Sequence, residues 1–247
     1  MASIAAPVVN TASRERRFYT RMALFLVALV FIGFAPSFYL RGIVPEFPRP
    51  NPTLPPAVLL HGGLFTAWML VFVAQTQLVA SGRRDLHMKL GVAFMLLAVS
   101  LIPVMYLTAV WQVERANQPP FTTPLDWSAL PLAAIPPFAA MIWLGWKRRR
   151  EPQWHKRLML GAAMSVALGP SFGRLPLAPP VTAGFALQML ATLIFFIPLF
   201  MWDKRSLGTT HPATMFVFGL YAFFTTAAVA LIATGSWAPV ARHLPGM

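Results

Sequence analysis

Long apolar runs alternate with short polar segments along almost the whole chain. A transmembrane helix needs about 20 mainly apolar residues to cross the hydrocarbon core of a bilayer. The pattern therefore predicts an all-α membrane protein, a bundle of seven transmembrane helices. The seven stretches that reach or approach this length are Met22–Leu40, Ala57–Val79, Leu90–Trp111, Ala129–Trp146, Leu158–Gly173, Val181–Met201 and Ala213–Ser236.

The fourth and fifth stretches are the weakest of the seven. The fourth contains Pro131, Pro136 and Pro137, and the fifth is short and contains Pro170. Proline removes a backbone donor and kinks a helix, but neighbouring helices in a bundle can satisfy the freed carbonyls. We therefore expect kinked helices here, and a six-helix arrangement is the alternative.

The basic residues predict the orientation of the bundle. If the N-terminus is cytoplasmic, the inner segments hold fifteen of the twenty lysines and arginines and the outer segments hold five. Cytoplasmic loops of membrane proteins carry this excess of positive charge. We predict a cytoplasmic tail over residues 1–21, a single seven-helix domain over 22–240 and a short outer tail over 241–247, in a bacterial inner membrane.

The composition supports the membrane class and narrows the partners. Hydrophobic residues make up 57% of the chain and charged residues 11%, against about 25% charged in a typical soluble domain. The net charge of +13 is distributed in short clusters between apolar runs, which favours anionic lipid headgroups over nucleic acid. We expect membrane lipids and other membrane proteins as partners, and no nucleic acid.

Several classes of chemistry are excluded or disfavoured. The chain has no cysteine, which excludes disulfides and thiolate-bound metals. The predicted spans contain no Asp, Glu or Lys, and such residues mark proton relays and ion-coupled transport. Without a carboxylate in the spans there is no conventional catalytic triad. No catalytic residue is predicted.

The proline-rich segment Arg41–Pro56 connects the first two stretches. Such a segment is stiff and extended. It is either a lid over the outer face or a passive connector.

A short repeat introduces two of the predicted helices. Residues 85–90 (DLHMKL) and 153–158 (QWHKRL) both read His-x-basic-Leu, and each is followed by a glycine, Gly91 or Gly161. The repeat places His87 and His155 where their helices enter from the cytoplasm, and His211 precedes the seventh helix in a similar way.

Neutral imidazole is a common ligand of iron, copper and zinc, and two imidazoles can hold a haem iron. His87 with His155 is the preferred pair among the three histidines at the cytoplasmic ends. Histidines that merely occupy a membrane interface are the structural alternative.

His61 lies near the outer end of the second helix, on one stripe with Trp68 and Gln75 at helical spacing. It lies roughly 27 Å from the inner end of that helix, too far to share a metal with His87 or His155. The position of His61 therefore predicts one of two roles, a ligand in a second cofactor site at the outer level or a hydrogen bond to a neighbouring helix.

Three motifs carry a resemblance to known proteins: residues 60–63 (LHGG), 85–91 (DLHMKLG) and 154–159 (WHKRLM). They resemble a group of uncharacterised bacterial multi-pass membrane proteins. The layout is also similar to histidine-bearing membrane families, one of which assists cytochrome oxidase maturation, and to ascorbate-reducible transmembrane b-type cytochromes. The latter resemblance implies haem b between helices. Those cytochromes have paired histidines at both levels, whereas this chain has only His61 within the outer level, and His243 of the tail is its one candidate partner there.

Three hypotheses follow. The first is a redox-linked protein that binds haem b or a metal through His87 and His155. The second is a non-enzymatic accessory or assembly subunit with structural histidines. The third is a carrier of a small neutral solute through a proline-kinked bundle.

Overall fold

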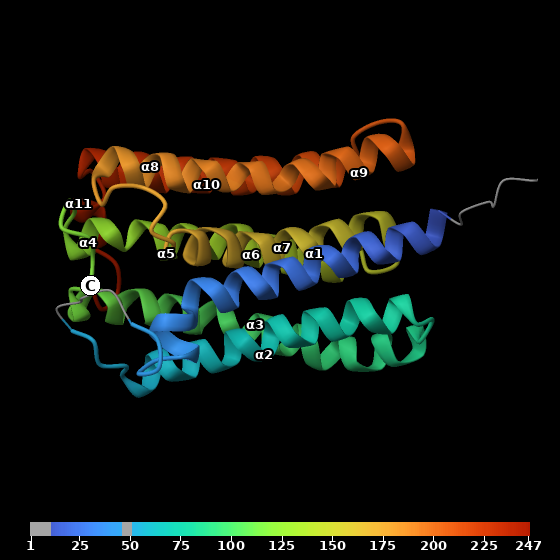
Figure 1. Cartoon of the computed structure of the whole chain (residues 1–247), viewed down its shortest axis with the longest axis horizontal. Coiled ribbons are helices and arrows are strands. Elements are labelled where there is room, and N and C mark those ends of the chain that lie inside the picture. Colours follow the sequence, from blue (N-terminus) through green and yellow to red (C-terminus); the bar gives the residue numbers. More distant parts are fainter. Residues whose placement is uncertain (1–10, 46–50) are drawn as a thin grey trace, which may run out of the picture.

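The computed structural model describes residues 11–45 and 51–247, and its regular elements in these ranges are helices (Figure 1). In chain order they are α1 (Thr11–Phe34) with the π-helix Ala35–Tyr39, α2 (Pro56–Ala80), α3 (Arg84–Arg115), α4 (Pro124–Trp127), α5 (Ala129–Ala133), α6 (Ile135–Lys147), α7 (Pro152–Phe172), α8 (Thr182–Ala191), the 3₁₀ helix Thr192–Phe196, α9 (Ile197–Leu207), α10 (Pro212–Thr234) and α11 (Ala238–Ala241).

Six helical segments of the described chain are long and apolar enough to cross a membrane. They are Ala12–Tyr39, Pro56–Ala80, Arg84–Arg115, Pro124–Lys147, Thr182–Leu207 and Pro212–Thr234. The predicted all-helical, multi-pass character is confirmed at this level. The remaining predicted stretch, Leu158–Gly173, forms most of α7, which is helical but is not one of these six.

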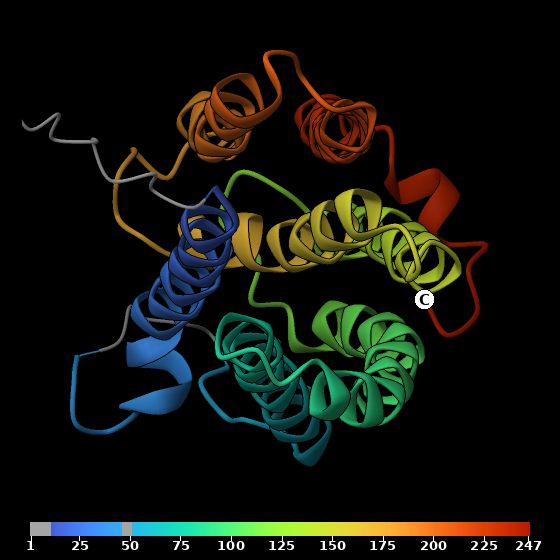
Figure 2. The ribbon, with the colours of Figure 1, turned by 90° about the vertical axis from the view of Figure 1, so that its right-hand side faces the viewer.

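Helix α7 occupies the middle of the bundle, between α1, α6 and α10 (Figure 2). Thirteen of its 21 residues are buried. Small residues such as Gly161, Ala162 and Ser165 make up much of its length and allow neighbouring helices to approach closely. A helix enclosed by other helices does not need an apolar surface facing lipid, which explains its lower apolar content.

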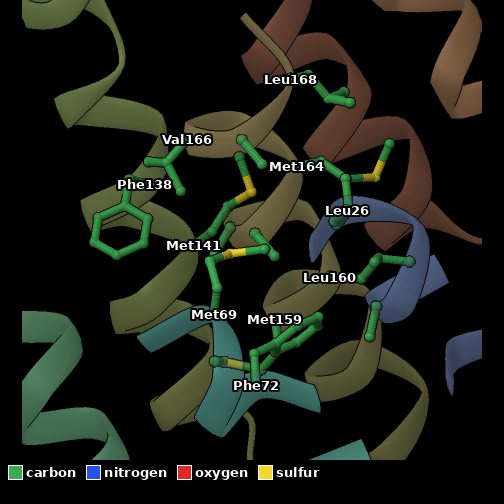
Figure 3. Packing of buried hydrophobic residues seen from close by; sticks show 14 of the residues in the cluster. Leu26, Met69, Phe72, Phe138, Met141, Met159, Leu160, Met164, Val166 and Leu168 are labelled. Carbon is green, nitrogen blue, oxygen red and sulfur yellow. The ribbon is translucent and has the colours of Figure 1, made fainter. Parts of the chain in front are cut away.

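The core around α7 is rich in methionine (Figure 3). Met159 and Met164 of α7 are buried together with Met69 of α2 and Met141 of α6. The unbranched, polarisable thioether fills irregular gaps between helices. These contacts join α2, α6 and α7 in one cluster, which fixes the loops that follow α2 and α6 relative to each other.

The apolar segment Pro124–Lys147, which contains the fourth predicted stretch, is divided into three helical pieces, α4, α5 and α6. Pro131 cannot donate to the carbonyl of Trp127, and Pro137 cannot donate to that of Ala133. The helix is accordingly interrupted at Ser128 and Ala134, but the pieces remain in one segment.

The proline-rich connector is only partly described, and the central part of the predicted lid, residues 46–50, lies outside the described residues. Beyond it, the carbonyls of Asn51 and Thr53 accept hydrogen bonds from Arg115 at 3.2 and 2.7 Å. The Asn117 side-chain amide also donates to the Asn51 carbonyl at 2.6 Å. This part of the connector is fastened to the end of α3.

Candidate functional site: a histidine pair beside a buried ion pair

The turns between α2 and α3, between α6 and α7 and between α9 and α10 lie at the same end of the bundle as the start of α1 (Figure 1). His87 is the fourth residue of α3 and His155 the fourth residue of α7, whereas His211 is the N-cap of α10. The structure therefore brings these three histidines to one end of the molecule.

The two histidines of the repeat lie next to each other. The ring centroids of His87 and His155 are 6.2 Å apart, and the ring planes are at 78° to each other. Both side chains are half-buried. The contact joins the α2–α3 hairpin to the α6–α7 hairpin, so each member of the pair comes from a different hairpin.

A backbone carbonyl orients the His155 ring. Its Nδ1 lies 2.8 Å from the carbonyl oxygen of Gly145, in the last turn of α6. The last four carbonyls of a helix lack partners within that helix. Because a carbonyl only accepts, Nδ1 of His155 carries the proton and Nε2 retains its lone pair. The side chain therefore caps α6 and presents an unprotonated nitrogen.

The His87 ring faces the backbone carbonyl of Gln75 in α2. Its Nδ1 is buried without a hydrogen-bond partner among the described residues. The hydrogen bond to a backbone carbonyl thus orients one ring of the pair, that of His155. A metal-bound imidazole is usually oriented in this way, with its other nitrogen donating to a carbonyl or carboxylate.

His211 has a different local role. Its Nδ1 accepts a hydrogen bond from the backbone N–H of Ala213 at 3.0 Å, which caps the N-terminus of α10. Its ring packs edge-on against Trp154 at 5.5 Å. Burial and the nearby Arg157 guanidinium lower the pKa of His211, which favours the neutral ring that the cap requires. Because Nδ1 of His211 already accepts this hydrogen bond, its lone pair is not available to bind a metal.

The stripe predicted on α2 is buried along most of its length. Trp68 is completely buried and packs against Phe72, Phe94 and Phe138 with ring centroids 5.3 to 5.9 Å apart. Within the described chain, His61 Nδ1, Trp68 Nε1 and the Gln75 side-chain amide are buried without hydrogen-bond partners. His61 stacks on Phe65. The structure places no second histidine ring against His61 among the described ring contacts.

A fully buried ion pair lies on the other side of α7, and sequence reasoning missed it. Arg157 and Asp203 have no exposed side-chain surface. Arg157 donates to Asp203 through both Nε, at 3.0 Å, and a terminal nitrogen. Asp203 also accepts from the Thr214 hydroxyl at 2.6 Å and the His211 backbone N–H at 2.9 Å.

The repeat contained a partial signal for this pair. Arg157 corresponds to Lys89 in the repeat, and Lys89 is exposed whereas Arg157 is enclosed. Both are among the fifteen basic residues that predict the orientation, and Asp203 lies just beyond the predicted span Val181–Met201. In the structure α9 continues to Leu207, and Asp203 is buried. Buried charges near a membrane span are rare and are usually paired.

In comparisons with known proteins, no family model, no curated protein and no solved structure matches this chain. The resemblance carried by the three histidine motifs therefore stays a prediction. What the fold itself defines is a multi-pass helical membrane protein with a histidine pair at the basic end of the bundle.

Proposed function

We propose that this chain is a seven-helix protein of the bacterial inner membrane that binds a b-type haem, or another transition-metal ion, between His87 and His155. In this proposal the N-terminus and the histidine pair face the cytoplasm and the C-terminus faces outward. The bound group serves a redox or assembly role at the membrane.

The topology rests on length and charge. Helix α7 has 21 residues and is therefore about 31 Å long, close to the thickness of a bilayer core. If α7 crosses the membrane inside the bundle, the strongly basic segments all fall at the end where α1 begins. That distribution is the one that the positive-inside rule requires of a cytoplasmic N-terminus.

The single observation that carries the site is the contact between two imidazoles, of which His155 is oriented by the Gly145 carbonyl. A metal–imidazole nitrogen distance is about 2.0–2.1 Å, and the ring centre lies about 1 Å further away, so two opposed imidazoles on one metal have centroids about 6 Å apart. The observed separation of the His87 and His155 centroids is 6.2 Å. The pair thus already has the spacing of a two-imidazole site.

The donor set favours haem over a bare ion. No group of three or more His, Asp or Glu residues in the described chain could hold a metal ion. Haem supplies four ligands itself and needs only axial ligands from the protein, so two histidines suffice. In this site His87 and His155 would hold the iron, Gly145 would orient the His155 ring, and the haem would supply one-electron redox chemistry.

The test is an absorption spectrum of the purified full-length protein, oxidised and dithionite-reduced, with a metal assay on the same sample. We expect a Soret band with sharp reduced α and β bands. His87→Ala and His155→Ala should each abolish these bands, and the exposed His243→Ala should preserve them.

Each outcome decides between the hypotheses. A colourless protein that retains a stoichiometric metal ion only while both histidines are present would assign a metal site without haem. A colourless, metal-free protein from haem-replete cells would refute the proposal. The accessory-subunit hypothesis would then account best for the chain.

A further inference from the structure

An apolar groove runs along the outside of the bundle between α3 and α6. It has a volume of about 440 Å³, and its walls include Val92, Leu96 and Val99 of α3 and Trp143 and Trp146 of α6. Leu96 and Trp143 are 67% and 61% exposed, so the groove is open on the side that faces away from the core. In a multi-pass membrane protein this side faces lipid.

The groove has the length of one leaflet. On α3 it extends from Val92 to Ile102, ten residues or about 15 Å along the helix. Half of a bilayer's hydrocarbon core is also about 15 Å thick. The groove therefore begins near the basic end of the bundle and ends near the middle of the membrane, which matches the length of an acyl chain.

Basic side chains surround the end of the groove that lies nearest the membrane surface. The Lys147 ammonium lies 5.0 Å from the centroid of the Trp143 ring, and the Arg149 guanidinium lies 4.3 Å from that of Trp146. Lys89 is exposed on α3, three residues before Val92 and hence on the same helix face.

The acidic residues nearby do not neutralise this end of the groove. Glu151 is engaged by Arg148 at 2.9 Å, and Asp85 is exposed one turn before Lys89. The opening therefore has an excess of positive charge above an entirely apolar wall.

From this combination we infer that the groove is a binding site for an anionic phospholipid of the leaflet on the basic side. One acyl chain lies between α3 and α6, and the phosphate contacts Lys147 and Arg149. The inference is independent of the histidine pair, because it uses a different face of α3 and the opposite side of α6.

The experiment uses the full-length protein in vesicles that contain acyl-brominated phosphatidylglycerol or phosphatidylcholine. Bromine quenches the fluorescence of tryptophans in contact with the lipid chain. The fluorescence of Trp143 and Trp146 is the difference between the unmodified protein and the double variant Trp143→Phe/Trp146→Phe. Relative lipid affinities follow from the quenching of this part at graded fractions of each brominated lipid.

Each basic side chain near an anionic lipid contributes about a fivefold increase in binding. We expect about a tenfold or greater preference for phosphatidylglycerol at Trp143 and Trp146. Lys147→Ala/Arg149→Ala should remove most of this preference. Lys204→Ala/Arg205→Ala, which removes two exposed charges from the last turn of α9 at the same end, should leave it unchanged.

A second variant tests the groove itself. Ala139→Phe places a large side chain inside the groove and should reduce quenching by both lipids without changing the charge. Helix content and thermal midpoint, measured by circular dichroism, identify any variant that is misfolded. Equal affinity for the two lipids in the unmodified protein, or equal loss of preference in the two charge variants, would overturn the inference.

Discussion

Replacing Asp203 with alanine tests how much the buried ion pair contributes to the bundle. In the folded protein Asp203 accepts four hydrogen bonds, two from Arg157, one from Thr214 and one from the backbone of His211. Asp203→Ala removes the counter-charge, while Arg157 keeps only neutral partners, the Gln153 carbonyl and side-chain oxygens and the Thr214 hydroxyl. Breaking a buried pair from one side costs about 3–5 kcal/mol, since it leaves an uncompensated charge.

Two comparisons separate this effect from general damage. Replacing both partners, as in Arg157→Met/Asp203→Leu, removes the isolated charge, and such replacements are often nearly neutral. We therefore expect the double variant to be more stable than Asp203→Ala. Glu151→Gln breaks an exposed pair with Arg148 and should cost less than about 1 kcal/mol.

The assay is equilibrium unfolding of the detergent- or bicelle-solubilised protein, followed by circular dichroism. The free energy of unfolding should decrease in the order unmodified protein, Glu151→Gln, Asp203→Ala. A loss of less than about 1 kcal/mol in Asp203→Ala would refute the reasoning, because a charge left unpaired in a dry core cannot be that inexpensive. A double variant less stable than the single one would refute it equally.

Three further predictions concern packing and topology. Gly161→Ala should lower the free energy of unfolding by about 1–3 kcal/mol, because the new Cβ would lie 2.6 Å from Val217 and 2.7 Å from Met141. Gly91 occupies the matching position of the repeat and has open space around it, so Gly91→Ala should be neutral or stabilising by up to about 1 kcal/mol in the same unfolding assay. Trp68→Ala should lower the free energy of unfolding by about 3–5 kcal/mol, because it leaves a large cavity in a completely buried site. The loss should be larger than in Trp68→Phe, and equal losses in the two variants would contradict the packing argument. Alkaline phosphatase fused after the last residue should be active and a fusion in the α6–α7 turn inactive; the reverse pattern would invert the proposed topology.

The sequence by itself predicted the membrane class, the helices and the neighbourhood of the histidines. Apolar runs of the length of a bilayer can satisfy their backbone hydrogen bonds only as helices, so composition and length were enough for the elements. The repeat located His87 and His155 in the first turns of two helices, because a basic interfacial residue followed by apolar sequence marks where a helix enters the membrane. Their ligand role stays a prediction that the absorption spectrum tests.

Only the tertiary structure decided which helix lies at the centre and which charge is buried. Helix α7 is not among the six segments apolar enough to span a membrane, yet most of its residues are buried, because its small residues permit close packing that hydropathy does not measure. In the same way, Lys89 and Arg157 occupy equivalent positions of the repeat, yet one is exposed and the other is paired with Asp203. That difference depends on which helices surround each position, and side-chain partners so distant in the chain leave no local pattern in the sequence.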